Sequence, residues 1–349
     1  MEKRLKTTWQ AAAYDKQKQE WVHTELNSYD HNPDDIDWQA TPARITASRR
    51  KEKAKNYLSI VAMGDAQIGY RRVLDHEMQQ EEMIALHDER KMATARAIAR
   101  YCMPDIIVNL GDNIDLPDFS KFAPDSDHFY RTLAPSLQGV HDYYAQLRAD
   151  NPNARIVEVS SNHNERFNKA ILRQMPQLYN VKRPGDDSKY PVASYAYMAN
   201  LEHVGVEFID GYPAGELVIP RIGKAALRFA HGTETSSPSS SAASKAMKNN
   251  PYTFNFQGHS HTESSAWHTL PNGEQVGTFV LGALCRSTGI VPSYHNSVSA
   301  GGEVMHHQEN WHSSIGHIRM YEDGELEVNT IAINKDAVAH YEGKEFGCE

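Results

Sequence analysis

The order of secondary-structure elements between residues 57 and 160 constrains the fold of this chain more than any other feature. Apolar, β-branched runs at 57–63, 105–110 and 155–160 predict strands, and a glycine follows each of the first two. Helix-forming residues with a helical apolar period occupy 74–101 and 129–147 between them. Strand–helix–strand–helix–strand order predicts right-handed crossovers and a largely parallel sheet.

The second half of the chain has a different pattern, in which short strands alternate with turns such as Asp210-Gly211, Asn272-Gly273 and Asp323-Gly324. This pattern predicts a second sheet that packs on the first within one α/β domain. The expected strands are 194–198, 204–209, 216–219, 225–230, 253–256, 278–281, 316–321 and 325–331. We therefore expect a partly helical N-terminal extension over 1–55, the main domain over 56–335 and a C-terminal tail over 336–349.

The composition excludes several classes of protein. The chain has 349 residues, 40% of them hydrophobic, so it can bury a substantial core. No run approaches the roughly 20 apolar residues that cross a bilayer, and the polar N-terminus is not a secretory signal, so we predict a cytoplasmic protein without membrane partners. Three widely spaced cysteines indicate reduced thiols. The net charge of −9 argues against a broad nucleic-acid-binding surface but leaves room for a local basic groove.

Five short segments carry residue types that bind metals, and each lies at the end of a predicted strand. They are Gly64-Asp65-Ala66-Gln67, Gly111-Asp112-Asn113-Ile114-Asp115, Ser161-Asn162-His163-Asn164-Glu165, His231-Gly232 and Gly258-His259-Ser260-His261. In open α/β sheets, ligands bind beyond the carboxyl ends of the strands. We therefore expect these side chains to meet at one rim of the structure.

Carboxylates, an amide oxygen and imidazoles on one rim are suited to bind two divalent ions. Mixed nitrogen and oxygen ligands suit Mn, Fe, Zn or Ni. Two ions about 3.5–4 Å apart lower the pKa of a bridging water and bind phosphate oxygens. A phosphoester needs both effects because it hydrolyses extremely slowly without help. The segments therefore predict a two-metal centre that cleaves a phosphoester substrate.

At these segments the chain resembles the calcineurin-like metallophosphoesterases, whose signature runs Asp-x-His, Gly-Asp-x-x-Asp, Gly-Asn-His-Asp/Glu, His and Gly-His-x-His. The resemblance covers about residues 57 to 330 and implies a four-layer type of α/β sandwich, in which two mixed β-sheets are flanked by helices. It implies that one ion is bound by Asp65, Gln67, Asp112 and His261, and the second by Asp112, Asn162, His231 and His259. It also implies that a metal-bridging hydroxide attacks the phosphorus, that His163 protonates the leaving-group oxygen and that Asp115 orients it.

Several residues depart from the family signature. Gln67 stands where the family usually has histidine. An amide oxygen is a harder and weaker ligand than imidazole, so we expect loose binding at the first site, with Mn favoured and Mg preferred over Zn. Alternatively, Gln67 hydrogen-bonds a metal-bound water. Leu116 stands where the Ser/Thr protein phosphatases have an arginine, which argues against that type. Arg166 either binds phosphate or is a solvated helix residue.

The residues leave the natural substrate and the subgroup of the family open. The Asn162-His163-x-x-Arg166 run, the Gly282-Ala-Leu-Cys285 segment and the region of Trp311 look like a subgroup found in bacteriophages and prophages, which would place the protein in the host cytoplasm. A DNA or RNA nuclease of the same superfamily, with nucleic acid or a nucleotide as its partner, would carry the same motifs. A non-catalytic binding protein would keep the same fold without the activity. The serine-rich stretch 236–244 is expected to be a linker or a flap over the site.

Overall fold

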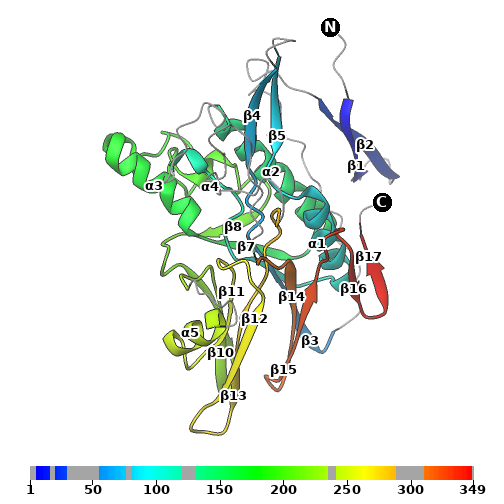
Figure 1. Ribbon diagram of the computed structural model, residues 1–349, viewed down its shortest axis with the longest axis vertical. Helices are drawn as coiled ribbons and strands as arrows, with labels where there is room; N and C mark the ends of the chain where they lie inside the picture. The colour runs from blue at the N-terminus through cyan, green and yellow to red at the C-terminus, as the bar shows by residue number, and fades with distance from the viewer. Residues whose placement is uncertain are drawn as a thin grey trace.

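The computed structural model describes residues 5–15, 20–29, 55–75, 80–119, 131–234, 241–287 and 310–347, and these form a mixed α/β structure (Figure 1). One sheet has six strands in the order β15-β14-β3-β6-β7-β8. Their bounds are β15 (Leu326–Ala332), β14 (Ser314–Tyr321), β3 (Tyr57–Met63), β6 (Ile106–Asn109), β7 (Arg155–Val159) and β8 (Val206–Ile209). The parallel run from β3 to β8 confirms the expected parallel sheet, and antiparallel β14 and β15 make the sheet mixed.

The two faces of this sheet join different hydrophobic cores. Along β3, Val61 and Met63 pack in a core with the helices α1 (Glu89–Cys102) and α2 (Leu133–Asp150). Ile60 and Ala62 point the other way, into a core shared with the second sheet. Since successive side chains of a strand alternate between faces, an apolar run such as β3 is buried on both.

The second sheet has five strands in the order β12-β13-β11-β10-β9. Their bounds are β12 (Ser264–Thr269), β13 (Gln275–Val280), β11 (Phe254–Gln257), β10 (Lys224–Ala230) and β9 (Glu216–Arg221). β10, β11 and β13 are parallel, and the two edge strands are antiparallel to their neighbours. The helix α5 (Ser241–Asn249) packs through Ala242 and Ala243 against β13.

Smaller elements complete the described residues. Three hairpins pair β1 (Leu5–Asp15) with β2 (Glu20–Tyr29), β4 (Tyr70–Asp75) with β5 (Gln80–Ala85), and β16 (Ala339–Tyr341) with β17 (Lys344–Phe346). The remaining helices are η2 (Pro117–Phe119), α3 (Asn162–Gln174), η4 (Pro176–Leu178) and α4 (Tyr195–Met198). The last hairpin, in the predicted tail, packs on the main domain, because buried Ala339 belongs to the same core as α1. Within the described residues, no helix is both long enough and apolar enough to cross a membrane.

Two helix and strand predictions in the main domain were wrong. The helix expected over 74–101 begins only at 89, and the hairpin β4–β5 precedes it. Asp88 caps the true start by accepting a hydrogen bond from the Lys91 amide. The strand expected over 194–198 is the short helix α4, which Ser194 caps. A short apolar run fits a helix or a strand equally well, and here the caps favour helices.

The prediction of a partly helical N-terminal extension was also wrong, because the segment expected to be helical forms the β1–β2 hairpin. Val22, Thr24 and Leu26 alternate with polar residues, and this period suits a strand. The serine-rich stretch ends in α5, whose small alanines allow close packing on the sheet; residues 235–240 lie outside the described part of the chain. The domain boundaries at 55 and 335 stay predictions.

Candidate metal centre

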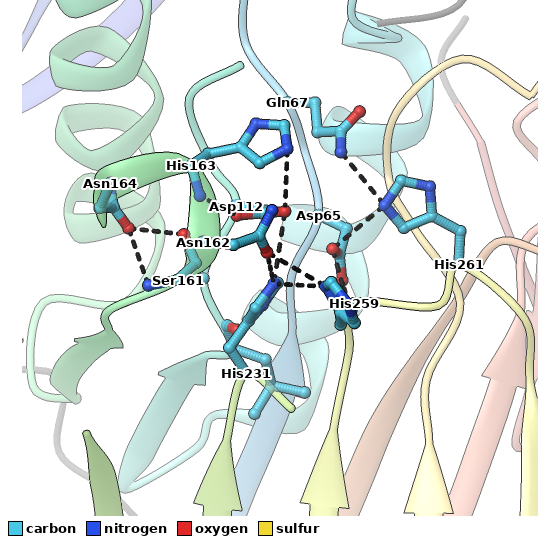
Figure 2. A network of polar contacts seen from close by, with 12 residues as sticks. Asp65, Gln67, Asp112, Ser161, Asn162, His163, Asn164, His231, His259 and His261 are labelled. Carbon is cyan, nitrogen blue, oxygen red and sulfur yellow. Dashed lines mark hydrogen bonds and ion pairs between the residues drawn. The ribbon is translucent and has the colours of Figure 1, made fainter. Parts of the chain in front are cut away.

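Side chains that follow five strands of the two sheets meet at one point (Figure 2). Asp65 and Gln67 follow β3, Asp112 follows β6, and Asn162 opens α3 after β7. His231 directly follows β10, and His259 and His261 follow β11. Side-chain contacts join these residues in two groups, and the His259 amide links the groups by donating to Asp65 Oδ2 at 3.1 Å, so the convergence expected at the rim is present (Figure 2).

The backbone at this rim has an uncommon conformation. The φ angles are 53° at Asp65, 46° at Gln67, 51° at Asp112, 71° at His259 and 56° at His261, all in the left-handed region. Such angles are uncommon outside glycine and cost about 1–3 kcal/mol each, so they persist only where the surroundings enforce them. Here the loops hold one another, since the amide of Asp65 donates to Gly111 O at 2.9 Å and that of Gln67 to Asp112 O at 2.8 Å. Strained residues of this kind cluster at active sites and ligand clamps, so the rim is a candidate functional site.

Four of these side chains form the compact ligand cluster, which we define as Asp112, Asn162, His231 and His259. His231 Nε2 lies 2.7 Å from Asn162 Oδ1, 3.1 Å from His259 Nδ1 and 3.3 Å from Asp112 Oδ2. Candidate ligand atoms of the two imidazoles and the carboxylate all lie within 4.8 Å of one another. Ligands that share an ion at about 2.0–2.2 Å lie roughly 3–3.5 Å apart, so this spacing suits a single cation.

The tautomer of His231 strengthens that assignment. Its Nδ1 lies 2.8 Å from the carbonyl oxygen of Leu110, which can only accept, so Nδ1 carries a proton and donates it. In the neutral ring, Nε2 then directs its lone pair at Asn162 Oδ1 and Asp112 Oδ2, which are also acceptors. Converging acceptors need a proton or a cation between them. The donor set therefore fits a divalent ion, with Leu110 fixing the ligating ring as in other metal sites.

The charges around the ligand cluster favour a cation at the same point. Burial raises the pKa of Asp112, but His163 and His231 outweigh it and hold the pKa well below its ordinary value. Burial lowers the pKa of His231, but the nearby Asp112 carboxylate brings it above its ordinary value overall. Burial, together with His231, lowers the pKa of His259 to about 4. Asp112 is therefore ionised at pH 7 and His259 is neutral, as ligands must be.

A second group of ligands lies beside the first. His261 Nε2 is 3.2 Å from Asp65 Oδ1 and 3.2 Å from Gln67 Nε2. All three side chains are buried, and Gln67 Oε1 has no hydrogen-bond partner among the residues that the structure describes. As placed, Gln67 therefore turns its amide nitrogen, which is not a metal ligand, toward the site. Rotation of the amide group by half a turn would exchange the two atoms and direct the unpaired oxygen inward.

His163 lies between two carboxylates next to the ligand cluster. Its Nε2 is 3.4 Å from Asp112 Oδ2, and its Nδ1 is 3.3 Å from Asp115 Oδ1 without hydrogen-bond geometry. Its backbone amide donates to Asp112 Oδ1 at 3.2 Å, so the first turn of α3 also supports that carboxylate. Arg166 donates to the carbonyl oxygen of Asp115 at 3.2 Å and thereby holds the Asp115 loop.

Ser161 and Asn164 have a structural role at the start of α3. Asn164 Oδ1 accepts hydrogen bonds from the Ser161 amide at 3.1 Å and from Ser161 Oγ at 2.7 Å. These contacts form a capping box at the start of α3. The pair therefore fixes the turn that presents Asn162 and His163 to the site.

A buried polar network supports the Asp112 loop from behind. Asn113 Nδ2 donates to the Tyr144 hydroxyl at 2.6 Å, and that hydroxyl donates to Glu158 Oε2 at 2.8 Å. The Tyr195 hydroxyl donates to the same carboxylate at 3.0 Å. Glu158 is fully buried, which raises its pKa to about 7. Sequence reasoning missed this network, although a glutamate inside the apolar β7 was a signal of a buried partner.

Two other neighbours of the site follow from the tertiary structure. The Trp311 ring lies edge-on to His261, with ring centroids 4.3 Å apart, and limits how that imidazole can turn. The amides of Leu284 and Cys285 donate to the Asp65 carbonyl oxygen at 3.2 and 3.0 Å. In the sequence these two segments stood out only as points of resemblance, and their contacts place them around the second group of ligands, Asp65, Gln67 and His261.

Gly258 leaves no space for a side chain beside Asp65. A Cβ at this position would lie 2.2 Å from Asp65 Oδ2. We expect Gly258→Ala to displace the carboxylate and weaken Mn²⁺ binding on the order of 10–100-fold, as measured by titration calorimetry. The control is Gly273→Ala, whose Cβ meets nothing within 4 Å but whose φ is 87°. It should cost about 1–2 kcal/mol of unfolding free energy and leave metal affinity unchanged. Equal affinity in Gly258→Ala and the native protein would contradict the role of Asp65.

Two solved structures are distant neighbours of this chain. No family model and no curated protein matches the sequence. The chain is similar to Yfce, a phosphoesterase from E. coli, with a TM-score of 0.29 and 10% identity, over 79% of this chain and 100% of that one. It is also similar to a dimetal phosphatase from Danio rerio, with a TM-score of 0.28 and 10% identity, over 80% and 100%. Both neighbours are phosphoesterases, but superpositions this loose carry no argument, so function is argued from the site.

Proposed function

We propose that this chain is a metal-dependent phosphoesterase with the calcineurin-like arrangement of layers, in which α1 and α2, the two sheets and α5 form a four-layer sandwich. The observation that carries the proposal is the ligand cluster. A carboxylate, an amide oxygen and two imidazoles converge at 2.7–3.3 Å spacing, with their acceptor atoms facing one another. Buried, strained and mutually fixed ligands of this kind suit metal-assisted hydrolysis.

Two ions are assigned to the site. The ligand cluster would bind one, and Asp65, His261 and the rotated Gln67 would bind the other, with Asp112 shared between them. Nitrogen and oxygen ligands without a thiolate suit Mn²⁺, and Fe, Zn, Ni or Mg are the other candidates. When bound, the ions would acidify a water and offset the negative charge of the phosphoryl oxygens.

His163 is assigned as the general acid, and Asp115 as the group that orients it. The Asp115 carboxylate lies 3.3 Å from the imidazole on its Nδ1 side, a position from which it can orient the ring. The Nε2 atom faces Asp112 and the centre, so it can give its proton to the departing oxygen. Arg166 is assigned to hold the Asp115 loop through its bond to the Asp115 carbonyl oxygen, and a direct role in phosphate binding is the alternative.

Gln67 is expected to make the first metal site the weaker one. Replacing it with His would supply an imidazole ligand where the native amide turns its nitrogen inward. We expect Gln67→His to raise Mn²⁺ affinity at one of two sites on the order of tenfold, and to shift the metal preference toward Zn²⁺. Titration calorimetry with each metal would measure both effects. Gln67→Glu keeps the size and shape of the native side chain but replaces the amide with a carboxylate. Unchanged metal affinity in both variants would contradict the assignment of residue 67 as a metal ligand.

A substrate panel tests the proposed function. Purified protein should hydrolyse p-nitrophenyl phosphate or bis-p-nitrophenyl phosphate after addition of Mn²⁺, and lose activity after treatment with a chelator. The ratio between the two substrates separates a monoesterase from a diesterase. Binding of Mn²⁺ without turnover of any phosphoester would support a non-catalytic binding protein and contradict the proposal.

A further inference from the structure

A continuous stretch beyond the site is exposed along its whole length although it is well ordered. Every residue from 172 to 185 is exposed, and five large apolar side chains in it are each 39–46% exposed. These side chains are Leu172, Met175, Leu178, Tyr179 and Val181. Successive hydrogen-bonded turns hold the backbone, from Met175 N to Ile171 O through to Val181 N to Leu178 O. Several exposed large apolar side chains on a short hydrogen-bonded stretch of backbone are typical of an interaction site.

The same stretch is basic, in a chain whose net charge is −9. Residues 172–185 include Arg173, Lys182 and Arg183 and contain no acidic residue. The positive charge extends back along α3 toward the ligand cluster. Asn162, Arg166, Lys169 and Arg173 recur at intervals of four, three and four residues, which places them on one face of the helix.

This face of α3 begins at the site and points to solvent. Asn162 is its first residue and belongs to the ligand cluster, and Arg166 reaches the Asp115 loop. The opposite face carries His163, Phe167 and Ile171, which are buried. Lys169 is 57% exposed and lies 3.8 Å from Glu165, a weak surface pair. Successive members of the basic face are roughly one helical turn, about 5.4 Å, apart.

We propose that the exposed face of α3 and the 172–185 stretch, together called the α3 track, bind single-stranded nucleic acid and lead its backbone to the site. This inference rests on the proposed function, since it names a phosphodiester polymer as the substrate of the same centre. Basic side chains in a line contact successive phosphates, and exposed apolar and aromatic side chains such as Tyr179 stack on bases. A duplex hides the faces of its bases, so the apolar half of the track selects a single strand.

The local charge also explains how an acidic protein can bind a polyanion. Binding of nucleic acid depends on the groups within a Debye length of the phosphates, about 8–10 Å at physiological salt, and more distant charges are screened. In Figure 1, α3 lies at the edge of the structure, with the ends of β10 and β11 below it. From 162 to 187 the chain has five basic residues and three acidic ones, Glu165, Asp186 and Asp187, so this part of the chain keeps a net charge of +2 (5 − 3) beside the candidate centre.

Binding can be measured without turnover, which separates this inference from the proposed function. The probe is a 5′-fluorescein-labelled 16-nucleotide oligo(dT), followed by anisotropy in a chelator at 50–200 mM salt. We expect the double variant Lys169→Glu/Arg173→Glu to weaken binding at least tenfold. The slope of log K against log salt should become flatter by about 1.4, because each of the two lost phosphate contacts contributes about 0.7. Tyr179→Ala should weaken binding about tenfold with the slope unchanged. Hydrolysis of p-nitrophenyl substrates should stay at the native rate in both variants.

The control is Lys248→Glu/Lys335→Glu, which makes the same charge change at exposed positions in α5 and before β16. It should bind the oligonucleotide as the native protein does, apart from a small general loss. Two results would overturn the inference directly: no oligonucleotide binding by the native protein at 50 mM salt, or equal losses of affinity in the control and α3 variants. A third is competition for the labelled oligonucleotide by poly-glutamate as strong as by unlabelled oligo(dT), which would indicate an acidic protein partner. If the native protein binds the oligonucleotide as expected but hydrolyses no p-nitrophenyl substrate, only the proposed function is contradicted.

Discussion

Asp112→Asn should reduce turnover of every phosphoester on the order of 10³-fold or more and remove metal from both sites. Asp112 is 1% exposed, and it is the carboxylate that the proposed function assigns to both ions. Asparagine keeps the shape but removes the negative charge that compensates for His231 and a cation. A loss of 10³-fold corresponds to about 4 kcal/mol of transition-state stabilisation. Steady-state kinetics with Mn²⁺ and metal analysis of the same preparation would measure both effects.

The matched control for this variant is Asp105→Asn, at the other end of β6. Asp105 Oδ2 accepts a hydrogen bond from the Ser59 amide at 2.7 Å, and an asparagine oxygen can accept the same bond. Metal content and kcat should therefore stay near native values in this control. An Asp112→Asn variant that keeps its metal and its activity would show that Asp112 is not a shared ligand.

His163→Ala should slow substrates with poor leaving groups by about 10²–10⁴-fold and p-nitrophenyl substrates far less. A poor leaving group needs a proton as its bond to phosphorus breaks, whereas p-nitrophenolate leaves without one. The imidazole is 3% exposed and lies between Asp112 and Asp115, so the substitution also removes a contact of each carboxylate. The kinetic comparison of an alkyl with a p-nitrophenyl ester separates acid catalysis from this structural effect, which would slow both alike.

His203→Ala serves as the control for this prediction. His203 is exposed and stacks on His141, with ring centroids 5.9 Å apart, and neither residue belongs to the site. Native rates on both ester types are expected for this variant. Equal slowing of alkyl and p-nitrophenyl esters by His163→Ala, with metal content unchanged, would contradict the general-acid assignment.

Strand ends were the part of the structure that the sequence predicted best. Runs such as β3 and β7 are mainly apolar and buried on both faces, which only a sheet covered on both sides allows. Because parallel strands end at a common edge, the residues just after them had to come together, and Asp65, Asp112 and Asn162 do. Their convergence therefore follows from topology more than from the residue types.

The errors fall where local sequence is ambiguous. Residues 70–85 contain helix formers, which predicted a helix. They form the β4–β5 hairpin, whose two ends are joined by a hydrogen bond from Leu86 N to Gly69 O. The edge strand β12 alternates exposed and half-buried residues and lacks an apolar run, so it was missed. The α5 helix was read as part of a serine-rich loop because its apolar face consists only of alanine.

The finer geometry of the site could not be predicted from one sequence. The left-handed angles at Asp65, Asp112 and His259 arise from hydrogen bonds between loops that are distant in sequence. The orientation of Gln67 depends on His261, and the tautomer of His231 depends on Leu110 O. Each of these features needs tertiary contacts, whereas the capping box at Ser161 and Asn164 is local and has a recognisable spacing.

Metal content of the purified chain tests the central claim most directly. After dialysis against buffer that contains Mn²⁺, which keeps the weaker site filled, elemental analysis corrected for free metal should find about two equivalents per native chain and close to none in Asp112→Asn. Phosphoester hydrolysis should rise with metal content in the same samples. Fewer than one equivalent in the native chain, with no hydrolysis after further Mn²⁺ is added, would contradict a two-metal phosphoesterase.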